Sequence, residues 1–174
     1  MRRVSRNVAF WIAVGVQVFL MAAVPATKIW VRSTGETVML SLRPVDPYDP
    51  ARGYHLVLAY EIGDASVFEN AELAAGRGTV YATVAADADG VGRPVRLTRE
   101  RPETLGENEV ALRGRARSGR ISYGIETFYI PEEGRVEREA RLREQFAETR
   151  AEVKVAASGD AALVALHFPD ETLR

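Results

Sequence analysis

The sequence predicts a mainly β protein in which an N-terminal transmembrane helix is followed by an antiparallel β domain with one amphipathic helix. Three observations predict this class. One long apolar segment lies near the N-terminus, segments of alternating apolar residues fill most of the remaining chain, and a single segment has a helical apolar stripe. The chain has 174 residues and no cysteine, so packing must hold the fold without disulfides or thiolate metal sites.

The N-terminal apolar segment has the length and the flanking charges of a membrane anchor. No charged residue occurs between Arg6 and Lys28, an interval that matches the roughly 20 residues required of a membrane-spanning helix. Three arginines lie before the segment, at positions 2, 3 and 6. By the positive-inside rule, these arginines predict a cytoplasmic N-terminus and an extracytoplasmic domain.

The predicted organisation of the chain has three parts: a cytoplasmic tail over residues 1–7, a transmembrane anchor over 8–27 and an extracytoplasmic β domain over 28–174. A cleaved signal peptide is the alternative, because the small residues at 24–26 offer a cleavage site that would leave a mature protein beginning at Thr27. The apolar run is longer than the usual 7–15-residue core of a signal peptide. Its length therefore favours an anchor.

The distribution of charge argues against a nucleic-acid-binding domain. The formal net charge is −1, but five of the 23 basic residues precede Glu36, the first acidic residue. From position 33 onward 18 basic residues stand against 24 acidic ones, a net charge of −6. Nucleic-acid binding requires a net basic footprint.

The first two strands are expected at 36–45 and 53–62, where β-branched, aromatic and alternating apolar residues predominate. The prolines and aspartates between them predict a stiff irregular loop, since proline lacks an N–H and aspartate bonds nearby backbone in turns. Residues 63–76 are expected to form a short helical turn or a loop.

Three hairpins and one helix complete the prediction, which totals seven or eight strands. The hairpins pair 78–87 with 93–100 across an Asp/Gly-rich turn, 109–117 with 121–130 across Ser118-Gly119, and 151–158 with 160–168 across Gly159-Asp160. The helix is expected over 131–150, where Pro131 suits the first turn and apolar residues recur at helical spacing.

Two blocks of residues resemble the GDYXXLXY family of bacterial membrane-anchored proteins. The first block contains Asp46, Asp49, Arg52, Gly53, Leu58 and Tyr60, and the second contains Tyr123, Gly124, Glu126 and Pro131. The namesake motif is degenerate, since Tyr54 stands at its aspartate and His55 at its first tyrosine. These ten residues are the candidate motif and interaction residues.

The resemblance implies a single-pass protein of the bacterial inner membrane with a periplasmic domain. It implies no established activity and no cofactor, and the partners it suggests are the lipid bilayer, through residues 8–27, and a polytopic membrane protein. We therefore expect a non-catalytic accessory or interaction domain. The alternatives are a hydrolase distantly related to the signal-peptidase fold and a secreted soluble binding protein.

The residues needed for the hydrolase are scarce. A serine/lysine dyad requires a buried lysine base, and the two lysines are Lys28, at the membrane edge, and Lys154, in an alternating strand. His55 and His167 lie in separate strands, and no serine stands in a nucleophile-elbow motif. These observations favour the prediction that the protein is not an enzyme.

Carboxylates are the remaining candidates for chemistry. Asp46 and Asp49 could contact calcium, but two groups fall short of the 6–8 oxygens that calcium takes. The segment "DADG" at 87–90 lacks the spacing of a calcium loop, so a turn is expected there. Strict alternation along 121–130 puts Glu126 on one face with Phe128, so we expect it to be partly buried. An ion pair with Arg52 is expected there, with a ligand-binding role for Glu126 as the alternative. Arg52 could instead pair with a carboxylate of its own loop.

Overall fold

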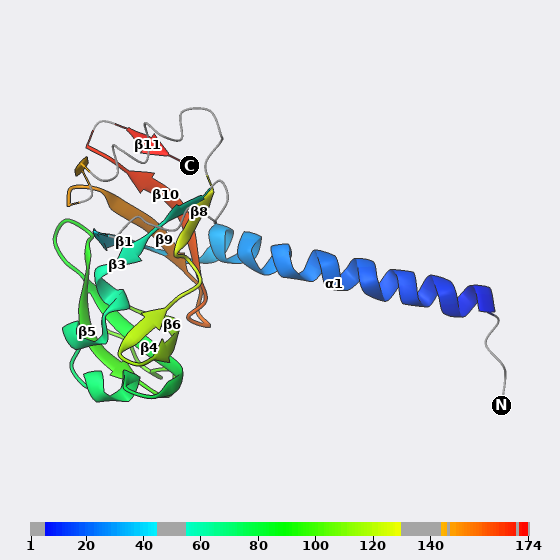
Figure 1. Cartoon of the computed structure of the whole chain (residues 1–174), viewed down its shortest axis with the longest axis horizontal. Helices are drawn as coiled ribbons and strands as arrows, with labels where there is room; N and C mark the ends of the chain where they lie inside the picture. The colour runs from blue at the N-terminus through cyan, green and yellow to red at the C-terminus, as the bar shows by residue number, and fades with distance from the viewer. Residues whose placement is uncertain (1–5, 45–54, 130–143, 146, 170, 174) are drawn as a thin grey trace.

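The computed structural model describes residues 6–44, 55–129, 144–145, 147–169 and 171–173. It confirms the predicted fold class: one N-terminal helix, α1 (Arg6–Thr34), projects from a mainly β domain (Figure 1). The N-terminal end of α1 lies farthest from the domain, and its C-terminal end enters the domain directly (Figure 1).

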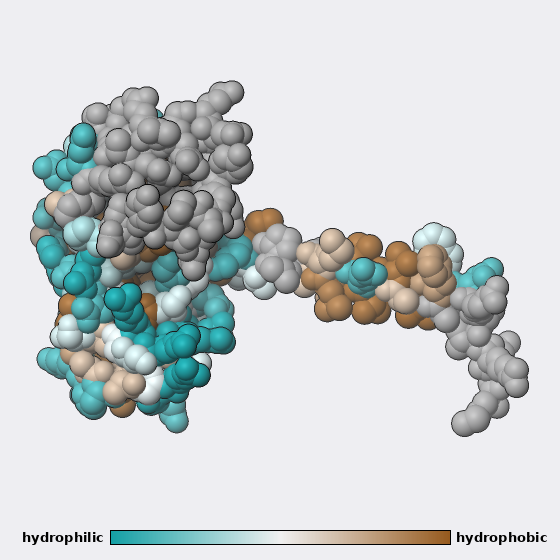
Figure 2. All heavy atoms as spheres, viewed as in Figure 1, coloured by the Kyte–Doolittle hydropathy of each residue, from teal (hydrophilic) through white to brown (hydrophobic). Residues whose placement is uncertain are grey.

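Helix α1 is long and apolar on its surface. Its 29 residues correspond to about 44 Å at 1.5 Å per residue, more than the hydrocarbon thickness of about 30 Å. Within it, Phe10–Thr34 has a mean hydropathy of 1.8 and is the one described helix that is long and apolar enough to cross a membrane. All of the exposed large apolar side chains of the described residues lie on α1 except Val57 and Leu105, and Figure 2 shows the resulting hydrophobic surface along the helix.

Only Gly35 separates α1 from the first strand, β1 (Glu36–Arg43). The Gly35 N–H donates to the Val31 carbonyl at 2.9 Å. A Cβ at position 35 would lie 2.6 Å from that carbonyl and 3.0 Å from the Val155 backbone nitrogen, so the chain passes too close to the domain for a side chain here. The helix therefore extends seven residues past the predicted end of the anchor and meets the domain without a linker.

The remaining elements follow in sequence. The strands are β2 (His55–Val57), β3 (Ala59–Tyr60), β4 (Arg77–Ala86), β5 (Gly92–Thr98), β6 (Glu109–Arg117), β7 (Arg120–Ser122), β8 (Thr127–Tyr129), β9 (Arg150–Val155), β10 (Ala161–His167) and β11 (Thr172–Leu173). Three short 3₁₀ helices follow β3: η1 (Glu61–Gly63), η2 (Ala65–Val67) and η3 (Ala71–Ala74). The last two lie within 63–76, where a short helical turn or a loop was predicted.

The strands form two main antiparallel sheets with the core between them. One has the order β11-β10-β9-β1-β3, the other has the order β5-β4-β6-β7, and β2 pairs separately with β8. Alternate residues of β1, namely Val38, Leu40 and Leu42, are buried, as the two-residue period of a strand requires. A Cβ at Gly92 would lie 2.8 Å from Val38 and 3.2 Å from Val84, which shows how closely the two sheets pack.

The three predicted hairpins are confirmed, as β4–β5, β6–β7 and β9–β10. At the β6–β7 turn Ser118 and Gly119 both have positive φ, 51° and 78°, which suits a two-residue hairpin loop. Two predicted strands were wrong in extent. The segment 53–62 contains the short strands β2 and β3, which join different sheets, and 121–130 is interrupted between β7 and β8.

The count of seven or eight strands was therefore too low, because the described residues contain eleven. Of the amphipathic helix predicted over 131–150, only 144–145 and 147–150 are described. Residues 144–145 are helical and Arg150 already belongs to β9. The rest of that prediction lies outside the described residues.

Candidate functional site

The two motif blocks meet in the folded domain. Strand β2 pairs with β8, which places His55 opposite Tyr129. Immediately after β2, the Leu58 N–H donates to the Glu126 carbonyl at 2.9 Å. Segments that lie more than 60 residues apart in the sequence thus form one site.

Two tyrosines, one from each block, join the segments reciprocally. The Tyr60 hydroxyl donates to the Ile125 carbonyl at 2.8 Å, and the Tyr123 hydroxyl donates to the Ile62 carbonyl at 2.7 Å. Both side chains are buried, with 3% and 5% of their surface exposed. Each phenol therefore satisfies a backbone carbonyl of the opposite segment, which a buried carbonyl requires.

The ionisation of these tyrosines is suppressed. Burial raises the pKa of Tyr60 and of Tyr123 above the ordinary value, and the nearby charge of Glu126 raises each pKa further. Both phenols are thus neutral donors at physiological pH. The arrangement holds two segments together and leaves neither hydroxyl free to act as a base.

Glu126 lies beside this pair, but not through the predicted alternation of a strand. The structure contradicts that alternation, because Tyr123, Ile125 and Phe128 are all buried. Gly124 has a φ of +73°, which interrupts the strand at a conformation favourable to glycine. The half-buried Glu126 carboxylate instead turns back and accepts a hydrogen bond from the Tyr123 N–H.

Seven of the ten candidate residues remain. Leu58 is buried at 3% exposure, and Gly124 is exposed. Five candidates lie outside the described residues: Asp46, Asp49, Arg52, Gly53 and Pro131. The predicted pairing of Arg52 with Glu126 therefore stays a prediction.

The family model of the GDYXXLXY protein matches residues 17–166. This range includes both blocks and all of the strands from β1 to β9. The chain belongs to the GDYXXLXY family. Neither the curated proteins nor the solved structures gave a match. Leu58 and Tyr60 are two of the residues after which the GDYXXLXY family is named, and both side chains are buried in the domain.

The second histidine of the GDYXXLXY domain joins three strands. His167 Nε2 lies 2.8 Å from Glu152 Oε2, and its Nδ1 lies 3.2 Å from Thr172 Oγ1. Because a carboxylate can only accept, Nε2 carries the proton of the first bond. His167 therefore links β9, β10 and β11.

The predicted turn at "DADG" is confirmed. Asp87 Oδ1 accepts from the backbone N–H groups of Asp89 at 3.0 Å and Val91 at 2.9 Å, and Oδ2 accepts from Arg93 at 3.0 Å. These bonds, led by the one from Val91, lower the pKa of Asp87. Among the described residues, no group of three or more His, Cys, Asp or Glu is placed to hold a metal ion.

Sequence reasoning missed a second contact region, at the base of α1. The Lys28 ammonium donates to the Ala161 carbonyl and the Arg32 guanidinium donates to the Leu163 carbonyl, each at 2.8 Å. Both carbonyls lie on the part of β10 that pairs with β9 on one side only. The sequence does contain one indication of this region, because the i, i+4 spacing of Lys28 and Arg32 places both cations on one helix face.

Proposed function

We propose that this GDYXXLXY protein is a single-pass protein of the bacterial inner membrane whose periplasmic β domain serves as a non-catalytic accessory or interaction domain. Helix α1 crosses the bilayer, with the N-terminus in the cytoplasm. The partner is a polytopic membrane protein that the domain contacts at the membrane surface.

The observation that carries this proposal is the combination of an apolar, exposed α1 with a direct attachment to the domain. A helix with large apolar side chains on all sides needs an apolar environment. Lys28 and Arg32 bind the β10 edge, and Gly35 alone joins α1 to β1. The domain would therefore sit at the bilayer surface in one orientation.

The use of the motif residues supports an interaction role over catalysis. Tyr60 and Tyr123 are neutral and engaged with backbone carbonyls. Lys28, one of the two lysines, donates to Ala161. The exposed apolar Val57, at 44% exposure, lies on β2 beside the motif site and offers a contact for a partner.

Fractionation tests the anchoring part of the proposal. The full chain should stay in the membrane pellet through an alkaline carbonate wash, and a reporter fused after Arg174 that works only outside the cytoplasm should be active. Release into the soluble fraction, with a mature N-terminus at Thr27, would favour the secreted binding protein instead.

Photo-crosslinking in living cells tests the interaction part. A photoreactive residue at Val57 should capture a polytopic membrane protein, while the same residue at Leu105, also exposed at 40%, serves as the matched control. Equal capture from both positions, or none from Val57, would contradict an interaction surface beside the motif site. Hydrolysis of a membrane peptide by the purified chain would favour the hydrolase.

A further inference from the structure

The outer face of the four-stranded sheet carries a row of arginines across three adjacent strands. Arg77 of β4 lies opposite Arg117 of β6, and Arg117 lies opposite Arg120 of β7. All three residues are exposed. Like charges directly opposite each other in a sheet are destabilising, so this row of arginines lowers the stability of the fold.

The basic surface continues along β6 with the two-residue period of a strand. Arg115 and Arg113 follow Arg117 on the exposed face, whereas the residues between them are buried. Arg113 is paired with Asp160 at 2.6 Å. We call the remaining four residues the arginine surface: Arg77, Arg115, Arg117 and Arg120.

The arginine surface has no acidic partner within the described part of the chain. Asp64, whose backbone bridges to Arg120, directs its carboxylate to Arg43 at 2.7 Å. This concentration of positive charge occurs in a chain with 24 acidic residues, all of them after the anchor. An external anion is the natural counterpart of four exposed guanidinium groups.

Contacts connect this surface to the membrane end of α1. Lys28, the first charged residue after the apolar segment, binds the Ala161 carbonyl. The neighbouring Asp160 pairs with Arg113, and the Arg113 N–H donates to Gly159 at 2.8 Å. The β9–β10 turn therefore lies beside the end of the apolar segment of α1, and the arginine face begins beside this turn.

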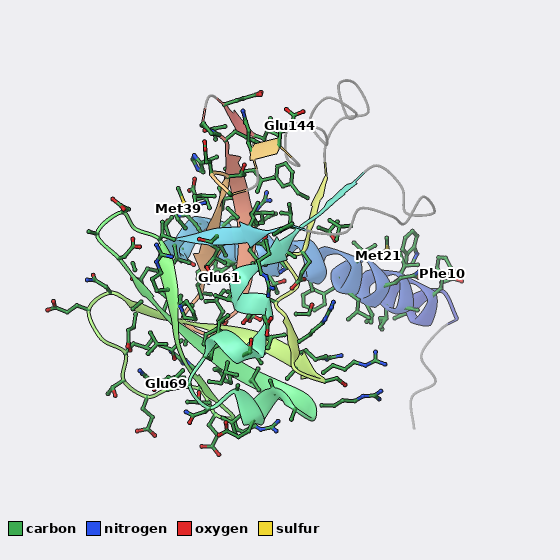
Figure 3. The ribbon with its side chains drawn as sticks, turned by 60° about the vertical axis from the view of Figure 1, so that its left-hand side comes forward. Phe10, Met21, Met39, Glu61, Glu69 and Glu144 are labelled. Carbon is green, nitrogen blue, oxygen red and sulfur yellow. The ribbon has the colours of Figure 1, made fainter. Side chains whose placement is uncertain are left out.

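The figures agree with this placement. Figure 2 shows a strongly hydrophilic surface on the side of the domain from which α1 leaves, next to the root of the helix. In Figure 3, side chains with nitrogen at their ends extend from the lower sheet on the side toward which α1 runs.

We propose that the arginine surface binds the phosphate-bearing headgroups of anionic phospholipids in the membrane that α1 crosses. The inference rests on the anchoring stated under the proposed function. A basic residue near an anionic bilayer contributes roughly a fivefold factor to association, so four of them bind strongly even when each contact is exposed. The surface would fix the rotation of the domain about α1.

A fluorescent label on the full chain in lipid nanodiscs tests the proposal. The chain has no cysteine, so Ser122→Cys gives one labelling site, on β7 opposite Arg115. The quencher is a phosphatidylcholine with a spin-labelled headgroup. Quenching should increase when phosphatidylglycerol is added to phosphatidylcholine discs, and the increase should disappear in about 1 M NaCl, where the Debye length is about 3 Å.

The charge variant Arg117→Gln/Arg120→Gln removes two of the four arginines and weakens association with the anionic surface by roughly thirtyfold, so the response to phosphatidylglycerol should be strongly reduced. The matched control is Arg93→Gln/Arg101→Gln, which removes the same charge from exposed positions outside the arginine surface and should keep the response. The unfolding midpoint of the charge variant should be unchanged or higher, because opposed like charges are removed.

Three outcomes would overturn the inference. Equal quenching in both kinds of disc would show that lipid charge is not recognised and would point to an acidic protein as the counterpart. Loss of the response in the control variant would show that total charge matters and the arginine surface does not. A chain that fails to copurify with the discs would overturn the anchoring as well, which separates that failure from the other two.

Discussion

Tyr60 and Tyr123 each donate a hydrogen bond across the same junction, from the phenol of one segment to a backbone carbonyl of the other. Their acceptors, Ile125 and Ile62, lie two residues from the partner tyrosine in the sequence. The pair thus connects the end of β3 to the chain between β7 and β8 at two points. This reciprocity gives Tyr60 and Tyr123 a structural role, because each hydroxyl holds a backbone carbonyl of the other segment.

Removing either hydroxyl should destabilise the domain. Tyr60→Phe or Tyr123→Phe leaves a buried carbonyl without its donor, which costs about 1–3 kcal/mol. Urea unfolding of the full chain in micelles measures the loss. The control is Tyr81→Phe, at a half-buried position on β4, which should stay within about 0.5 kcal/mol of the wild type. Equal losses in all three variants would contradict the reciprocal pair.

Gly124 should be required for its backbone conformation alone. Nothing lies within 4 Å of a Cβ built there, but its φ is +73°, so Gly124→Ala should cost about 1–2 kcal/mol through the strain of a left-handed conformation. Gly76→Ala is the matched control, since its Cβ is equally free and its φ lies outside that region. The prediction fails if the two variants unfold at the same urea concentration.

The parts of the fold that sequence could predict are those set by local pattern. Strand β6 has the predicted bounds because apolar and arginine residues alternate along it, and Ser118-Gly119 provides the turn. The break at Gly124 could not be derived from alternation, and the bond beside it, from Tyr123 to the Ile62 carbonyl, joins a distant segment. A glycine inside a strand pattern often marks a bulge or a bend, so Gly124 itself indicated that the strand could be interrupted there.

The arginine surface could likewise be predicted only in part from the sequence. The repeat of Arg113, Arg115 and Arg117 is visible in the sequence, but Arg77 lies 40 positions before Arg117 and joins it only through the β4–β6 register. The attachment of Lys28 to β10 likewise joins residues 133 positions apart. Pairing between distant strands is a property of tertiary packing, which local periodicity does not contain.

The attachment of α1 to the domain should depend on its two cations. Lys28→Ala/Arg32→Ala removes both bonds to β10 and exposes carbonyls to solvent, so the cost should be small, about 0.5–1.5 kcal/mol for each bond. The larger effect should be on mobility, because a spin label on the domain would reorient more freely relative to α1. Lys154→Ala, which changes a half-buried lysine on β9, should leave the mobility unchanged. Identical spectra for both variants would contradict a fixed attachment.

The Asp64–Arg43 pair should give a small acid dependence of stability. The hydrogen bond from Arg43, with those from Ser66, lowers the pKa of Asp64 from 3.8 to about 2. A folded-state pKa below the unfolded one stabilises the fold above the unfolded pKa, and this contribution disappears as the pH falls through the folded pKa. Since both side chains are more than a third exposed, the contribution is about 0–1 kcal/mol.

Comparing the wild type with Asp64→Asn tests this linkage. The difference in unfolding free energy should be largest at neutral pH and should shrink as the pH falls from 3.8 to about 2. Urea titrations of the full chain across this range measure it. A difference that does not change with pH would show that the charge of Asp64 contributes nothing to the fold.

We propose that α1 crosses the membrane and holds the domain at its periplasmic surface. Because the chain has no cysteine, single substitutions can report the side of the membrane: Ser5→Cys before α1 and Ser158→Cys in the exposed β9–β10 turn. With a maleimide that cannot cross the inner membrane, Ser158→Cys should be labelled in intact spheroplasts and Ser5→Cys should be labelled only after lysis. Labelling of Ser5→Cys alone in intact spheroplasts, or protection of both positions until lysis, would contradict the proposal.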